Sequence, residues 1–66
     1  MHYHVSMIKG NKLEEVESHQ SKEDAISSLD QHQAENESCG INCRRDSGYV
    51  LVVEDIDCYY VVSSHR

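Results

Sequence analysis

Apolar and polar side chains alternate along the first residues of the chain. Tyr3, Val5 and Met7 are separated from one another by polar residues, and the pattern starts after His2. A period of two residues is typical of a strand that has one buried face and one exposed face. The pattern therefore predicts a strand that runs to about Lys9.

The next segment has two interpretations. Gly10-Asn11 favours a turn, after which residues 12–18 return as a second strand. Alternatively, a helix begins at Asn11 and runs on, because Val16 and later apolar residues fit a helical stripe. That stripe has no apolar member between Val16 and Ala25. We therefore prefer the turn and the second strand.

A helix is predicted to begin at Ser21. The hydroxyl of Ser21 can cap the first turn, and Asp24 follows three residues later, which is close to a capping box. The helix should extend to about Asn36, and Gly40 can end the helical region in a left-handed conformation. One narrow face of it carries Ala25, Ile26, Leu29 and either Gln33 or Ala34.

Three short runs rich in Val, Ile and Tyr follow the helix. They cover residues 41–46, 49–54 and 58–63 and are separated by acidic turns. The predicted fold is one α+β domain over residues 1–66 with the order β-β-α-β-β-β. An antiparallel sheet of four or five strands would carry one helix on one face.

The last two of these runs are apolar at both odd and even positions. A strand that faces water on one side should alternate, but Tyr49–Val53 and Tyr59–Val62 do not. One short helix covers only one face of a sheet. The second face would then meet a partner, a second copy or a terminus, unless these are central strands that tolerate surface valines.

The acidic composition of the chain limits the classes of partner that it can bind. The chain has 66 residues, 12 acidic and 6 basic side chains and a net charge of −6. Direct binding of DNA or RNA requires a positively charged surface. A negatively charged chain is attracted instead to a basic surface on another protein. The alternative is that acidity only keeps a small domain soluble. No apolar stretch reaches membrane-spanning length and no signal peptide is evident, so we expect a cytoplasmic protein without a membrane partner.

Metal and catalytic chemistry have weak support in the sequence. Cys39, Cys43 and Cys58 form an odd set of thiols without Cys-x₂-Cys spacing, which favours free cysteines. A Cys₃His zinc site that adds His65 is a minor alternative. His2 and His4 share a face of the first strand, where they either share a metal ion or are simply exposed. With neither an activated nucleophile nor a phosphate-binding loop, we expect no enzyme and no cofactor.

Acidic residues and tyrosines are the candidate partner-binding residues. Carboxylates crowd the turn between the last two strands and recur in the second strand, and tyrosines suit the edge of an interface. A solvated charged face is the ordinary alternative. The candidates are Glu54, Asp55, Asp57, Tyr59, Tyr49, Glu14, Glu15 and Glu17.

In size, acidity and element order, from Ser21-Lys22-Glu23-Asp24 to the Cys58–Val62 strand, the chain resembles small phage-encoded inhibitors of bacterial defence, including anti-CRISPR proteins. The resemblance implies a non-enzymatic inhibitor that docks on a basic, nucleic-acid-binding surface of a larger complex, as a nucleic-acid mimic or a steric blocker. Arg44 and Arg45 depart from a uniformly negative mimic. The alternatives are an obligate homodimer and, less favoured, a zinc-stabilised domain.

Overall fold

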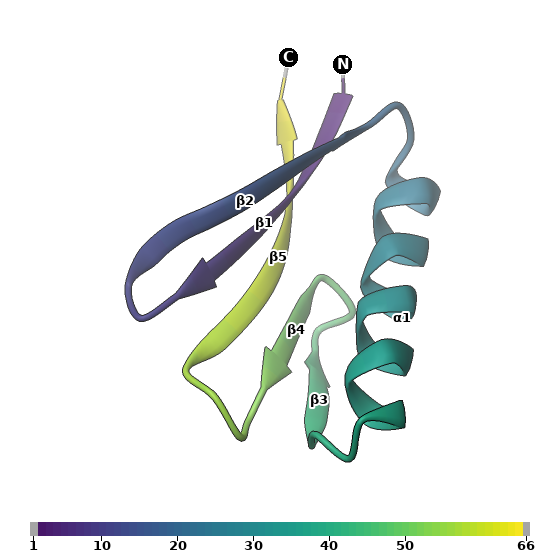
Figure 1. The fold of residues 1–66 in the computed structure, drawn as a ribbon. Helices are drawn as coiled ribbons and strands as arrows, with labels where there is room; N and C mark the ends of the chain where they lie inside the picture. The colour runs from purple at the N-terminus through teal and green to yellow at the C-terminus, as the bar shows by residue number, and fades with distance from the viewer. Residues whose placement is uncertain (1, 66) are drawn as a thin grey trace.

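The computed structural model describes residues 2–65, and these form the predicted order of five strands and one helix (Figure 1). The strands pair antiparallel throughout, in the spatial order β2-β1-β5-β4-β3. The helix lies on one face of this sheet and contacts every strand. The predicted α+β fold is therefore confirmed. The elements are β1 (His2–Lys9), β2 (Lys12–His19), α1 (Lys22–Ser38), β3 (Cys43–Asp46), β4 (Val50–Val53) and β5 (Cys58–His65).

A tight turn at Gly10-Asn11 connects β1 to β2. Both residues have positive φ, 56° and 65°, as a two-residue type I′ hairpin turn requires. The Gly10 amide also donates a hydrogen bond of 2.9 Å to the Asp57 carbonyl, which joins this turn to the turn between β4 and β5. The second strand is thus present, and the alternative helix from Asn11 is wrong.

The helix begins where its capping signal predicts. The Ser21 side chain accepts a hydrogen bond of 3.1 Å from the Asp24 amide, and Ser21 itself has extended backbone. This contact satisfies one of the amides that have no partner within the first turn. Ser21 therefore sets the boundary between the β2–α1 connection and α1.

At its other end α1 extends two residues beyond the predicted Asn36. Gly40 has a φ of 78°, and the amides of Gly40 and Ile41 donate hydrogen bonds of 3.0 Å to the carbonyls of Glu37 and Asn36. This is the Schellman arrangement of a helix C-terminus. Since Ile41 closes the helix, β3 begins later than the sequence suggested, at Cys43.

The last strand is longer than the prediction, which ended at Ser63. It pairs with β1 over eight residues, from His2 opposite His65 to Lys9 opposite Cys58. Pairing along the full length of β1 supplies backbone hydrogen bonds that local propensity does not reveal. β5 therefore lies at the centre of the sheet, between β1 and β4.

The core lies between α1 and the sheet. Val5, Ala25, Leu29 and Leu51 have at most 1% of their surface exposed. Tyr3, Cys43, Tyr60 and Val62 pack around them. On the helix, Ala25 and Leu29 are buried as predicted, whereas Ile26 and Gln33 are half-buried and Ala34 is exposed. Within residues 2–65, no helix has the length and apolar character that crossing a bilayer requires.

Candidate functional site

The face of the sheet that points away from α1 is rich in apolar side chains. Val5 and Leu51 face the helix, so their neighbours along each strand point to the other side. On that side, the strand register places one residue from each of β2, β1, β5 and β4 in a row across the sheet. We call this side of the sheet the open face. Its central residues are Leu13, Val16, Ser6, Ile8, Val61, Tyr59, Val50 and Val52.

No described element covers the open face. Leu13 keeps 63% of its surface exposed, Val16 50% and Tyr59 40%, whereas Ile8 and Val61 in the middle are half-buried by their neighbours. Contiguous exposed apolar residues on a small domain mark interaction surfaces more often than scattered ones do. The open face is therefore the strongest candidate for a docking surface.

Four of the predicted partner-binding residues meet at one end of the sheet. Glu54, Asp55, Asp57 and Tyr59 line a hollow of about 380 Å³ at the turn between β4 and β5. Tyr59 belongs both to this hollow and to the open face. The hollow therefore adjoins the apolar surface, and three acidic residues line it.

Two of these carboxylates also have contacts within the chain. Asp55 accepts a hydrogen bond of 2.9 Å from the Asn42 amide, and a Glu54 oxygen lies 3.9 Å from Nε of Arg44. Asp55 therefore helps to hold the β4–β5 turn against the start of β3. Glu54 and Arg44 are both about half exposed, so their pairing leaves the Glu54 carboxylate accessible to a partner.

Two of the predicted acidic residues of β2, Glu15 and Glu17, lie on the helix side of the sheet rather than on the open face. Glu14 lies at an irregularity where the β1–β2 register shifts, and Glu15, opposite Met7, is exposed on the helix side. Glu17 also faces the helix, where Ser28 donates to it over 2.5 Å and His32 over 2.8 Å. Glu17 therefore serves contacts within the domain.

These contacts set the protonation of Glu17. Partial burial acts to raise its pKa, but hydrogen bonds from Ser28, His19 and His32 outweigh burial and lower the pKa to about 2. An ionised carboxylate only accepts hydrogen bonds, so each imidazole must present an N–H to it. The His19 contact measures 2.9 Å. The Ser28 and His32 contacts therefore join α1 to β2 through the Glu17 carboxylate.

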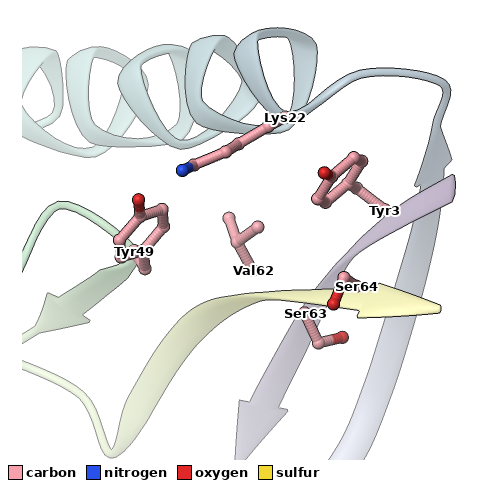
Figure 2. Close-up of a pocket in the computed structure, with 6 residues that line it drawn as sticks. All are labelled: Tyr3, Lys22, Tyr49, Val62, Ser63 and Ser64. Carbon is pink, nitrogen blue, oxygen red and sulfur yellow. The ribbon is translucent and has the colours of Figure 1, made fainter. Parts of the chain in front are cut away.

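Tyr49 lies away from the other predicted residues, on the helix side of the sheet. Figure 2 shows the Lys22 side chain extending from the start of α1 toward the Tyr49 ring. The Val62 side chain points from β5 toward the helix. The Lys22 ammonium lies 5.0 Å from the ring centroid, and contact with Tyr49 raises the pKa of Lys22. Together with Tyr3, Ser63 and Ser64 these residues line a cleft of about 370 Å³.

The adjacent arginines of β3 point to opposite sides. Arg45 faces α1 and forms a hydrogen-bonded ion pair of 2.5 Å with Asp30. Arg44 pairs in register with Val52 and so lies on the open face. Only one of the two arginines therefore interrupts the negative charge near the hollow.

The cysteines and His65 do not meet in one place. Cys58 and His65 lie at opposite ends of β5, about 23 Å apart at the usual strand rise. Cys58 is buried, Cys43 half-buried and Cys39 exposed at the end of α1. Burial raises the pKa of the Cys43 and Cys58 thiols, which favours the neutral thiol, as is usual for cysteines that pack inside a domain. The Cys₃His alternative is therefore wrong.

Comparisons with protein-family models, curated proteins and solved structures find no match for this chain. The fold class and the geometry above are thus the basis for any functional conclusion. Sequence reasoning missed the group formed by Glu17, Ser28 and His32. Its one local signal was the spacing of Ser28 and His32, four residues apart on the same helix face.

Proposed function

We propose that this protein is a non-enzymatic binding module that uses the open face and the acidic hollow beside it to dock on a basic protein. The observation that carries the proposal is the uncovered apolar surface that extends from Leu13 to Tyr59. A standard interface buries about 800 Å² on each partner, about a fifth of this protein's 4355 Å². An interface of that size requires the open face rather than one turn or cleft.

Charge favours a basic protein over a second copy as the occupant. The chain carries a net charge of −6, so two copies repel each other, whereas a basic surface is attracted. Tyr59 would fill the centre of the interface, and Glu54 and Asp57 would pair with basic side chains at its edge. A partner that normally holds nucleic acid has such a surface, and an inhibitor of that partner is the role we favour.

The test is a pull-down from lysate of the source cell or its host, across a series of rising salt concentrations. The first variant, Glu54→Gln with Asp57→Asn, removes two charges beside the open face. The matched control, Glu23→Gln with Glu35→Gln, removes two exposed charges from α1. We expect a basic protein that elutes as salt rises, is lost by the first variant and is kept by the control.

A second variant tests the apolar part of the surface. Val16→Ser with Tyr59→Ser should weaken capture at every salt concentration, because it removes apolar area rather than charge. Capture that is unaffected by both variants would contradict the proposal. Light scattering at micromolar concentration tests the alternative occupant: a mass of twice 7.6 kDa that returns to 7.6 kDa in the Val16→Ser, Tyr59→Ser variant would show that a second copy covers the open face.

A further inference from the structure

Three histidines meet on the open face, at the opposite end of the sheet from the acidic hollow. His2 and His65 are direct partners in the pairing of β1 with β5. His4 follows His2 by two residues and therefore points to the same side. Two neighbouring strands thus bring together residues from both ends of the described chain.

The imidazole rings are close enough to share one ion. The ring centroids of His2 lie 5.0 Å from those of both His4 and His65, and the His4 and His65 centroids are 5.6 Å apart. One ring nitrogen from each residue lies within 4.8 Å of the other two. His2 and His65 are exposed and His4 is half-buried, so an ion can reach the group from solvent.

A neighbouring hydroxyl helps to orient one of the rings. The Ser18 Oγ atom of β2 lies 3.3 Å from Nδ1 of His4. This contact engages Nδ1 and leaves Nε2 of the same ring available. Metal-binding histidines are commonly held in this way by a second group on the other ring nitrogen.

We propose that His2, His4 and His65 form a binding site for one divalent transition-metal ion, with zinc as the representative ion. Imidazole nitrogen is a preferred ligand for zinc, copper and nickel, whereas calcium and magnesium prefer oxygen. Three imidazoles provide a three-ligand site with a fourth position for water or for a group of another molecule. The proposal is independent of the docking function.

The required geometry is within reach of side-chain rotation. Zinc–nitrogen bonds of about 2.0–2.1 Å in a tetrahedral site place the ligand nitrogens about 3.4 Å apart. From separations of up to 4.8 Å, the rings need to approach by about 1.5 Å at most. The paired strands fix the Cα positions, and the exposed His2 and His65 rings are free of the packing that would prevent their rotation toward a shared ion. A bound ion would join β1 to β5 through their side chains.

The first experiment titrates the full chain with Zn²⁺ and measures stoichiometry, affinity and melting temperature. We expect one ion per chain and a melting temperature higher by about 4 °C or more at saturating zinc. Substitution of Co²⁺ should give the strong visible absorption of a tetrahedral site. A chain that binds no zinc, or that binds it only as a bridge between two copies, would overturn the site.

Matched histidine variants locate the ion. His65→Gln and His4→Gln should each reduce zinc affinity by at least about tenfold. His19→Gln and His32→Gln remove the same side chain from the Glu17 group and should leave zinc affinity within about twofold of the original. Equal losses in both pairs would show diffuse binding and contradict the assignment.

A measurement on the unaltered chain avoids any dependence on how the variants fold. NMR of the imidazole nitrogens should show zinc-induced shifts at His2, His4 and His65. Shifts confined to His19 or His32 would overturn the site. The outcomes also separate the two proposals, because Glu54→Gln with Asp57→Asn should abolish partner capture without changing zinc affinity.

Discussion

The Ser28 hydroxyl of α1 donates a hydrogen bond of 2.5 Å to the carboxylate of Glu17 on β2. One helical turn later, His32 donates to the other oxygen of the same carboxylate, and its ring stacks on Tyr60 with centroids 4.3 Å apart. β2 is an edge strand and most of its side chains are exposed. The Glu17 carboxylate therefore connects the edge strand β2 to α1 through hydrogen bonds.

Glu17→Gln should lower the free energy of unfolding by about 1–2 kcal/mol, since it removes hydrogen bonds to a charged group at a partly exposed site. Urea denaturation measures the loss. Glu14→Gln, at an exposed position of the same strand, is the control and should change the free energy by less than about 0.5 kcal/mol. Equal losses in the two variants would mean that the contacts of Glu17 contribute nothing specific.

The same carboxylate predicts a dependence of stability on pH. Its pKa falls from 4.5 in the unfolded chain to about 2 in the folded chain. Because the pKa is lower in the folded state, ionised Glu17 stabilises the fold. This contribution is complete above pH 4.5 and is lost as the pH falls toward about 2. The difference in stability between the unaltered chain and Glu17→Gln should therefore shrink across this range. A difference that stays constant down to about pH 2.5 would contradict the role of ionised Glu17.

Two leucines allow a comparison of burial with side-chain chemistry held constant. Leu29 is fully buried beneath α1, whereas Leu13 on the open face keeps 63% of its surface exposed. Leu29→Ala should cost about 2–4 kcal/mol, which is most of the stability expected of a domain this small. Leu13→Ala should cost less than about 0.5 kcal/mol. If Leu13→Ala is as damaging as Leu29→Ala in urea denaturation, the open face is covered in the folded protein.

Gly10→Ala tests the turn between β1 and β2. The positive φ of Gly10 is strained for a residue with a Cβ, although nothing lies within 4 Å of where that atom would be. The expected loss of about 1–2 kcal/mol is therefore conformational rather than steric. Asn11→Gly, at the second positive-φ position, should be neutral within about 0.5 kcal/mol. A larger loss for Asn11→Gly than for Gly10→Ala would contradict the turn geometry.

Thiol accessibility gives a test that needs no substitution. Cys39 is exposed and Cys58 has 5% of its surface accessible, and burial raises the pKa of Cys58. Iodoacetamide should modify Cys39 first and Cys58 only in denaturant, because the thiolate is the reactive form. Peptide mapping by mass spectrometry gives the order. Rapid modification of Cys58 in the native protein would show that β5 opens locally.

The features that could be predicted from the sequence are set by residues that are close together in the chain. The Ser21–Asp24 spacing located the start of α1, and the alternation from Tyr3 onward located β1. Gly10-Asn11 indicated the first turn. Boundaries that depend on distant pairing were less accurate, and β5 extended to His65 because β1 provides a full-length partner.

The functional surface was harder to predict because its members come together only through strand order and register. Tyr49 and Tyr59 look equivalent in the sequence, yet one packs beside Lys22 and the other lies on the open face. Glu17 looked like another surface acid, but its partners are 11 and 15 residues away on α1. His65 faces His2 only because β5 pairs with β1.

The central place of β5 has a consequence for how the chain reaches its native state. Within residues 2–65, the β1–β2 and β3–β4 hairpins are joined in the sheet only through β5, which is synthesised after the other four strands. Until β5 emerges from the ribosome, the nascent chain can pair only within two separate hairpins, which are at best marginally stable on their own. Folding must therefore wait for Cys58–His65, and a product that stops short of this strand should be recognised by proteases as unfolded.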